Sequence, residues 1–201
     1  IKKDLKILKK SKKVDFVYIP KFKDIYNDKK KSKIRLLKKD KIMCAKFRKG
    51  HFEGVLDVMN KLTKIVKPKK IFMGEKDFQQ LYLVKKELGK RYKTKVVPCK
   101  TVRDRNNVAL SSRNLLLNKS SLIIAAKIYK KIVDIKKNII NKKNISSFLN
   151  LQKKELKKNY KIKIDYLELR NINNLKISST TKKSRLFIAY HINKVRLIDN
   201  L

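Results

Sequence analysis

The chain has 201 residues, 42% of them hydrophobic, so it is long enough and apolar enough to fold around a core. No apolar run reaches the ~18 residues of a membrane-spanning helix, so no membrane span is predicted. The formal net charge is +41, with 48 Lys but only 9 Arg. Lys is dispersed along the chain, and bidentate phosphate contacts favour Arg. We therefore attribute the charge to a compositional bias and expect only weak, salt-dependent binding to polyanions.

The first half of the sequence predicts an alternation of helices and strands. The expected elements, in chain order, are the end of an amphipathic helix (4–13), a buried strand ended by Pro20 (14–19), a polar segment (21–41) with a short strand near 34–37, a helix (54–66), a strand (69–74), a helix ended by Gly89 (77–88) and a strand ended by Pro98 (94–97). This alternation is typical of a parallel, doubly wound sheet.

The pattern changes after Asn114. The expected elements are two long helices (120–140 and 145–159), a strand (162–169) and a hairpin (185–190 and 194–198) around His191-Ile192-Asn193. We therefore predict a partial Rossmann-like α/β domain at residues 1–100 and a smaller α+β domain at 101–201. The two cysteines, Cys44 and Cys99, lack metal-ligand spacing and are predicted to be buried thiols in a reducing compartment.

Gly74-Glu75-Lys76-Asp77 lies where a predicted strand meets a helix. Ligands of open α/β sheets bind at this end of the strands, and the free N–H groups of the helix favour an anion. Lys76 can contact phosphate oxygens, and Asp77 can accept hydrogen bonds from ribose or cap the helix. Gln80 follows on the same helical face. Taken alone, the segment is equally a helix cap with solvated charges.

Residues 101–118 contain no Lys, although Lys forms about a quarter of the chain. Within them, Ser111-Ser112-Arg113-Asn114 offers two hydroxyls and a guanidinium that can close over a triphosphate, with Arg113 neutralising the leaving pyrophosphate. The alternative for this segment is a Ser-rich helix cap. Neither segment is a P-loop, because GxxxxGK[ST] is absent.

Five segments together resemble the pantothenate synthetase (pantoate–β-alanine ligase) family over nearly the whole chain. They are residues 14–20 (VDFVYIP, family VDLxFxP), 48–55 (RKGHFEGV, family RPGHFxGV with Lys49 in place of Pro), 71–81 (containing GEKDFQQL), 101–103 with 110–114 (TVR and LSSRN) and 196–200 (RLIDN). The resemblance implies a fold of the nucleotidyltransferase superfamily and a cytoplasmic, homodimeric enzyme without a specific nucleic-acid or membrane partner.

The resemblance also implies the site residues. ATP would be bound by Gly74, Glu75, Lys76, Asp77, Val102, Leu110, Ser111, Ser112 and Arg113, with the Val102 backbone at the adenine and residues 110–113 as a mobile phosphate clamp. Gln80 would bind pantoate. Mg²⁺ is expected on the triphosphate, and Asp4 falls near a family acidic position linked to that metal.

The implied reaction has two steps. The pantoate carboxylate attacks the α-phosphorus of ATP, giving pantoyl adenylate and pyrophosphate, and the β-alanine amine then displaces AMP to give pantothenate. No catalytic histidine is expected, because the chain starts at Ile1 and the family's N-terminal third, with its HxGH motif, is absent. His51 is not expected to replace that motif, and His191 is expected to be a surface residue. We therefore expect the chain itself to be inactive or nearly so.

Three alternatives stay open at this point. One is another adenylate-forming or nucleotidyl-transfer enzyme that uses a different acid. The second is a noncatalytic basic RNA-binding or interaction module, which would bind RNA tightly and ATP not at all. The third is a nonfunctional, poorly folded fragment with an exposed sheet edge.

Overall fold

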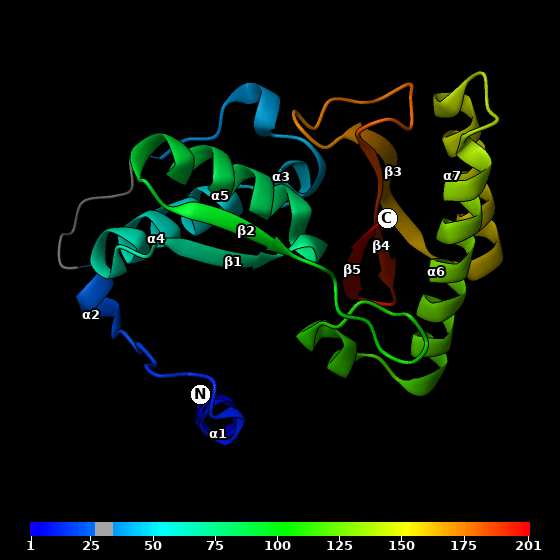
Figure 1. The fold of residues 1–201 in the computed structure, drawn as a ribbon. Coiled ribbons are helices and arrows are strands. Elements are labelled where there is room, and N and C mark those ends of the chain that lie inside the picture. Colours follow the sequence, from blue (N-terminus) through cyan, green and yellow to red (C-terminus); the bar gives the residue numbers. More distant parts are fainter. Residues whose placement is uncertain (27–33) are drawn as a thin grey trace.

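The computed structural model describes residues 1–26 and 34–201 (Figure 1). Its elements in chain order are α1 (Lys2–Ser11), α2 (Phe22–Ile25), η1 (Lys38–Asp40), α3 (Met43–Phe47), α4 (His51–Val66), β1 (Lys70–Gly74), η2 (Glu75–Asp77), α5 (Phe78–Arg91), β2 (Lys95–Cys99), η3 (Ser112–Leu116), α6 (Lys119–Ile139), α7 (Ile145–Tyr160), β3 (Lys163–Asn171), β4 (Ser184–Ile192) and β5 (Val195–Asn200). None of the helices in these ranges is long and apolar enough to cross a bilayer.

Strands β1 and β2 form a parallel pair, with Lys70 opposite Lys95 and Gly74 opposite Cys99. Helix α5 connects them and packs on both strands, and α4 packs against α5. This arrangement confirms the predicted Rossmann-like α/β class. The opposite face of the pair carries Phe72, which is 66% exposed, whereas parallel sheets are usually covered on both faces. The carboxyl ends of both strands point toward the second sheet (Figure 1).

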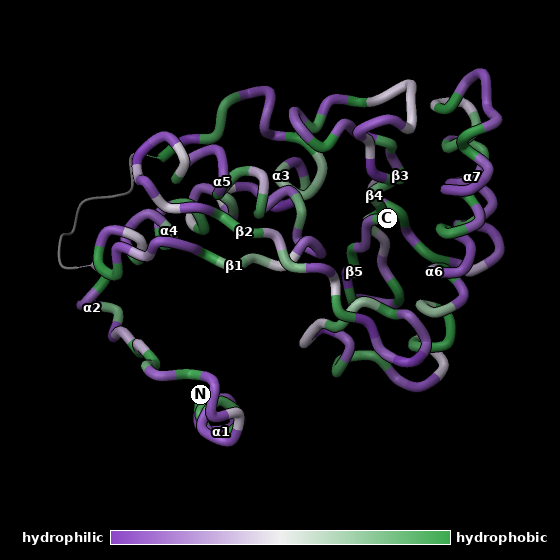
Figure 2. The backbone as a smooth tube through the Cα atoms, viewed as in Figure 1, coloured by the Kyte–Doolittle hydropathy of each residue, from purple (hydrophilic) through white to green (hydrophobic). Residues whose placement is uncertain are grey.

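The second sheet is antiparallel, in the order β3-β4-β5, and α6 and α7 pack against it. Successive side chains along β4 point to opposite faces of the sheet, and both faces are buried. Leu186 and Ile188 belong to the core under α6 and α7, while Phe187 and Ala189 belong to a second core shared with α4 and α5. Figure 2 shows hydrophobic residues recurring along these packed elements. Because the second core draws on both halves of the sequence, the domain boundary near residue 100 stays a prediction.

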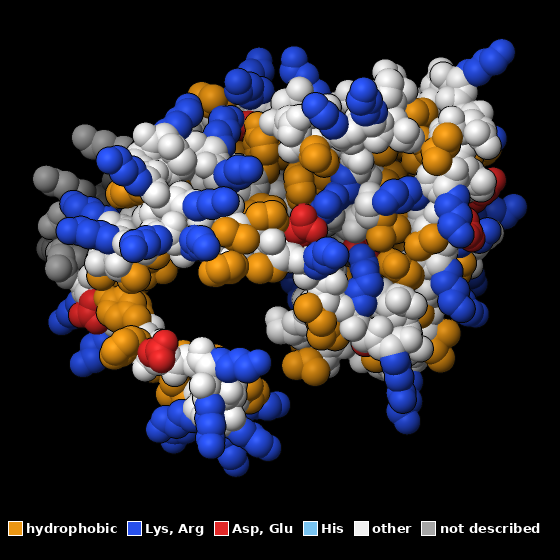
Figure 3. Space-filling view, in the orientation of Figure 1, with side chains coloured by type: hydrophobic (Ala, Val, Ile, Leu, Met, Phe, Trp, Pro, Cys, Tyr) orange, Lys and Arg blue, Asp and Glu red, His pale blue; other side chains and the backbone are white. Residues whose placement is uncertain are grey.

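The strand predicted at 14–19 is wrong. These residues are exposed and form no strand, and the segment runs apart from both sheets (Figures 1 and 3). A strand needs a neighbour for its N–H and C=O groups, and no strand of the described ranges lies beside this segment. Residues 34–37 form no strand either, although Ile34 and Leu36 are buried alternately. The rest of the predicted polar segment includes residues 27–33, which lie outside the described residues.

Two predicted stops are wrong, because the elements continue through them. Helix α5 runs past Gly89 to Arg91. Strand β2 includes Pro98, which is tolerated because β2 pairs with β1 alone among the described strands, so its other edge needs no donor. The hairpin turn is also shorter than predicted. It consists of Asn193 and Lys194, with Asn193 in the left-handed region at φ 54°.

Two predictions of burial also need correction. Cys44 is buried, but Cys99 at the end of β2 is exposed. His191 lies inside β4 and is half-buried, with its Nε2 3.2 Å from Asp165 Oδ1. A hydrophobic pattern locates a strand, but it does not determine which polar side chains find a partner across the sheet.

Gln79 in α5 fixes the segment before α4. It is 4% exposed. Its Nε2 donates to the carbonyls of Asp40 (3.2 Å) and Ile42 (2.8 Å), and its Oε1 accepts from the N–H of Ala45 (3.4 Å). The buried amide thus satisfies three main-chain groups of residues 40–45, which would otherwise be costly to bury.

Replacing Gln79 with Leu should lower the free energy of unfolding by about 2–4 kcal/mol, because three main-chain groups lose their partner. The matched control is Gln80→Leu, whose side chain makes no hydrogen bond within the described residues and should change stability little. Urea unfolding of both variants measures the difference. Equal stabilities would contradict this role for Gln79.

Candidate functional site

A cavity of about 230 Å³ lies where the carboxyl end of β1 meets β5. Its described lining includes the α3–α4 junction with Arg48 and His51, the η2–α5 segment from Lys76 to Gln80, the loop Ser111–Arg113, strand β5 from Arg196 to Asn200, and one residue each of β3 (Tyr166) and β4 (Phe187). This volume is just below the ~300–1,000 Å³ of common ligand pockets. The position at the carboxyl ends of parallel strands is the one expected for an α/β ligand site.

The structure brings both sequence-predicted segments to this cavity. Its lining includes Lys76, Asp77, Gln80, Ser111, Ser112 and Arg113, and excludes Gly74, Glu75, Val102 and Leu110. Lys76 and Arg113 therefore line the same cavity, although the two residues are far apart in the sequence. The binding roles of these residues stay predictions.

The four predicted residues outside the lining lie in the segments that lead to the lining residues. Gly74 ends β1, and Glu75 begins the η2 turn that carries Lys76. The N–H of Leu110 donates to the carbonyl of Val102 at 2.9 Å. That contact closes the loop that leads to Ser111 and leaves the Val102 side chain 66% exposed.

The cavity carries excess positive charge. Arg48, Arg113, Arg196 and Lys76 line it, whereas the carboxylates among its described lining residues are Asp77 and Asp199. Asp199 is engaged at both oxygens by Arg103, at 2.7 and 2.8 Å. The side chain of Asp77 is 53% exposed and 3.9 Å from the ammonium of Lys76. Cations gathered in a partly buried hollow favour binding of an anion.

The pKa shifts agree with this charge balance. Burial, together with the positive charges of Arg48 and Arg113, lowers the pKa of His51 below its usual value. Burial and the neighbouring Arg113 also lower the pKa of Arg48. Both shifts mean that a further positive charge is disfavoured there, so a bound anion would relieve the repulsion.

Strand β5 holds the phosphate-clamp candidate Arg113. The main-chain carbonyl of Arg196 accepts a hydrogen bond from Nη1 of Arg113 at 3.0 Å. The side chain of Arg196 contacts other groups. Its Nε lies 2.8 Å from Asp165 Oδ2, and its Nη1 lies 3.5 Å from the Cys44 sulfur. The Cys44 sulfur is also 3.1 Å from the buried hydroxyl of Tyr166.

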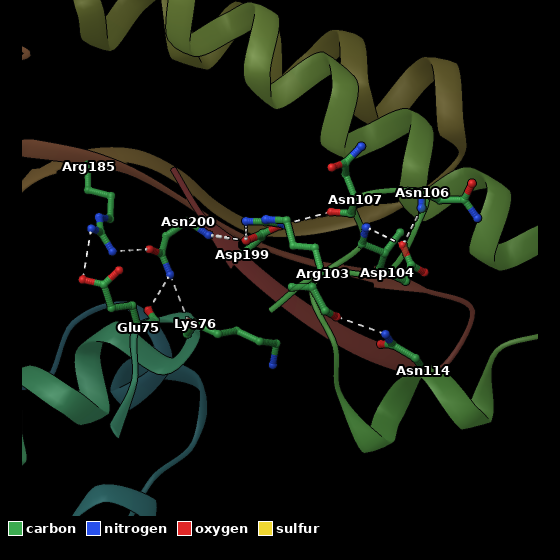
Figure 4. A network of polar contacts seen from close by, with 12 residues as sticks. Glu75, Lys76, Arg103, Asp104, Asn106, Asn107, Asn114, Arg185, Asp199 and Asn200 are labelled. Atoms are coloured by element: carbon green, nitrogen blue, oxygen red, sulfur yellow. Dashed lines mark hydrogen bonds and ion pairs between the residues drawn. The ribbon is translucent and has the colours of Figure 1, made fainter. Parts of the chain in front are cut away.

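Figure 4 shows the polar contacts that link β5 to the Glu75–Lys76 turn and to Arg103. Asn200 contacts the Glu75–Lys76 turn, and Asp199 contacts Arg103. Asn114 steadies the clamp loop by donating from Nδ2 to the carbonyl of Ala109 at 3.0 Å. These supporting roles were missed by the sequence reasoning. Their one signal was that Arg103, Asp199 and Asn200 stand in the segments that carry the family resemblance.

The described residues do not form a metal site by themselves, but they could contact a metal ion that is bound to the phosphates of a nucleotide. No group of three or more His, Cys, Asp or Glu side chains gathers anywhere in residues 1–26 and 34–201. Asp4 lies on α1, is 77% exposed, pairs with the terminal ammonium of Ile1 and does not line the cavity. Mg²⁺ at nucleotide sites takes one or two carboxylates plus substrate phosphates. Of the two carboxylates in the described lining, Asp199 is paired with Arg103 and Asp77 forms no ion pair with an Arg among residues 1–26 and 34–201, so Asp77 is the candidate for that contact.

The sequence profile of the pantoate–β-alanine ligase family matches residues 1–201. Pantothenate synthetase from Endomicrobium trichonymphae is 38% identical over 210 residues, which cover 100% of this chain and 71% of that relative. Pantothenate synthetase from Francisella philomiragia subsp. philomiragia is 38% identical over 204 residues, which cover 100% of this chain and 69% of that relative.

Solved structures give the same result. The crystal structure of pantothenate synthetase from Thermus thermophilus matches with a TM-score of 0.89 at 26% identity, covering 100% of this chain and 73% of the other. Pantoate–β-alanine ligase from Francisella tularensis, solved in complex with β-γ ATP and β-alanine, matches with a TM-score of 0.77 at 34% identity, covering 100% and 69%. Sequence and structure therefore agree that this chain belongs to the pantoate–β-alanine ligase family.

Proposed function

We propose that this chain carries the ATP-binding and pantoate-binding side of an ATP-dependent ligase that joins pantoate to β-alanine. The observation that carries the proposal is the cationic cavity at the end of β1, where Lys76 and Arg113 come together from two distant loops. The Francisella tularensis relative was solved with β-γ ATP and β-alanine, which supports assigning the anion as a nucleotide triphosphate.

In this proposal the triphosphate lies between η2 and the clamp loop. Lys76 and Arg113 contact phosphate oxygens, and the hydroxyls of Ser111 and Ser112 donate hydrogen bonds to them. Asp77 accepts hydrogen bonds from the ribose hydroxyls, or would contact a Mg²⁺ ion bound to the phosphates. Such an ion would neutralise part of the phosphate charge. Gly74 and Glu75 shape the turn, Leu110 leads into the clamp, and the backbone of Val102 meets the adenine.

The chain's groups would act on the reaction by positioning and charge neutralisation. Gln80, whose side chain lines the cavity, would hold pantoate so that its carboxylate oxygen faces the α-phosphorus. A P–O bond then forms to the carboxylate while the bond to pyrophosphate breaks, and Lys76 and Arg113 stabilise the charge on the leaving group. The β-alanine nitrogen next attacks the acyl carbon, loses a proton and displaces AMP, giving pantothenate.

Three expectations stay predictions: the Mg²⁺ ion, the homodimer and the cytoplasmic location. The activity of the 201 residues themselves also stays a prediction: we expect them to bind ATP without efficient turnover. Nothing favours the alternative of a basic RNA-binding module. Lys and Arg side chains are scattered over the face seen in Figure 3 and do not gather in one stripe.

Replacing Lys76 with Ala should weaken ATP binding by this chain roughly 10- to 100-fold, because hydrogen bonds to charged groups contribute about 1.5–3 kcal/mol. Isothermal titration calorimetry measures the dissociation constant. Lys158→Ala on the exposed face of α7 removes the same charge away from the cavity and should leave it unchanged. If the two variants bind ATP alike, the phosphate role of Lys76 is wrong.

ATP binding should also depend on the protonation of His51. Its pKa is lowered in the free chain by burial and by Arg48 and Arg113, and a bound polyanion would raise it again. Affinity should therefore strengthen as the pH falls through the raised pKa of the complex, and level off below the lowered pKa of the free chain.

Calorimetry at about pH 6, near the ordinary His pKa of about 6.5, should detect proton uptake when buffers of different ionisation enthalpy are compared. His51→Gln should abolish the part of this uptake due to the protein, whereas His191→Gln, outside the cavity lining, should keep it. Unchanged proton uptake in His51→Gln would show that the ring does not sense the ligand.

A further inference from the structure

Asn200, the last residue of β5, makes an unusual pair of contacts. It is 5% exposed. Its Nδ2 donates to the main-chain carbonyls of two successive residues, Glu75 and Lys76, each at 3.0 Å (Figure 4). A side-chain amide nitrogen has two hydrogens, so this one group satisfies both acceptors of the turn that carries the Lys76 side chain.

Arg185 fixes the direction of this amide. Its Nη1 donates to Asn200 Oδ1 at 2.9 Å, so the oxygen of the amide must face the guanidinium and the nitrogen must face the turn. Arg185 is itself held by Glu75 Oε1 at 3.5 Å, and its guanidinium lies 4.8 Å from the centre of the Phe78 ring. The amide is therefore oriented before any ligand arrives.

The turn that Asn200 holds is short. Its η2 helix has three residues, Glu75–Asp77, between the end of β1 and the start of α5. A turn of this length has few hydrogen bonds of its own, so its orientation depends on outside partners. Lys76 starts from this turn, and its side chain, 19% exposed, lines the cavity.

We propose that Asn200 is a positioning residue for Lys76. By binding the carbonyls of Glu75 and Lys76 together, it sets the direction in which the Lys76 ammonium enters the cavity. The proposal rests on the phosphate-binding role proposed above for Lys76. It adds that this role depends on a side chain more than one hundred residues away in the sequence, whose Nδ2 donates to the main chain of the turn.

A double-mutant cycle tests the proposal. The parent chain, Lys76→Ala, Asn200→Asp and the double variant are titrated with ATP by calorimetry. Asn200→Asp keeps the shape of the side chain but presents an acceptor oxygen to two carbonyl acceptors. It should weaken ATP binding about 10-fold, and adding Lys76→Ala to it should cause little further loss, because a misdirected ammonium has little left to contribute.

The outcomes separate the two proposals. If Lys76→Ala weakens binding equally in the parent and Asn200→Asp backgrounds, the effects are independent and Asn200 does not position Lys76. If Lys76→Ala has no effect in the parent although the parent binds ATP, the phosphate-binding role of Lys76 fails, and the positioning role fails with it; a parent that does not bind ATP contradicts the proposed function itself. A destabilising effect of Asn200→Asp alone would lower the melting temperature without producing the coupling.

Two further variants complete the experiment. Asn200→Ala removes the donors without adding a charge and should show the same coupling to Lys76, so it decides the question if Asn200→Asp does not fold. Asn138→Asp, on the exposed side of α6, adds the same charge away from the cavity and should leave both ATP affinity and the effect of Lys76→Ala unchanged. Additive losses in Asn200→Ala would overturn the proposal.

Discussion

The candidate site depends on one constraint: strand β5 is hydrogen-bonded to every loop that brings a sequence-predicted cation to the cavity. Its Asn200 holds the Glu75–Lys76 turn, its Asp199 holds Arg103 at the base of the clamp loop, and the carbonyl of Arg196 holds Arg113. Because β5 is paired along its length with β4 in the middle of the antiparallel sheet, these anchors share one rigid support. The turn that carries Lys76 and the side chain of Arg113 are therefore anchored to the same strand.

The few acidic residues are used largely in ion pairs. The sequence has 16 Asp and Glu against 57 Lys and Arg. Several of the acids form ion pairs at half-buried or buried positions: Asp165 with Arg196, Asp199 with Arg103, and Asp40 with Lys86. Unpaired charges at such positions would be costly. The Asp165–Arg196 pair offsets one cation of the cavity, and the Asp199–Arg103 pair offsets one carboxylate. Arg48, Arg113 and Lys76 then face Asp77 alone among the charged residues of the described lining.

Much of this fold could be predicted from the sequence. Apolar spacing located the main helices and the strands of both sheets, because burial of one face imposes a period on the sequence. The pattern failed at residues 14–19, where an apolar run has no neighbouring strand to pair with. It also failed at Gly89 and Pro98, because a residue that disfavours an element is tolerated when packing or an unpaired edge allows it.

The candidate site was predictable in part. Lys76, Gln80, Ser111 and Arg113 were identified because their segments resist the Lys-rich composition and resemble a known family. The contacts that fix them could not be predicted, since Asn200 and Lys76 are 124 residues apart and no local pattern records their meeting. Arg48 and His51 were in a matched segment, but only the fold brings them to the same cavity as Arg113.

Several of the site's anchors end on main-chain atoms. Arg113 is held by the carbonyl of residue 196, and Asn200 binds the carbonyls of residues 75 and 76. Every amino acid supplies a carbonyl, so mutation of the accepting residue leaves the acceptor in place. This chain is unusually rich in lysine. Because the accepting residue of each such contact can be replaced without removing the carbonyl, the contact and its geometry are kept when that residue changes.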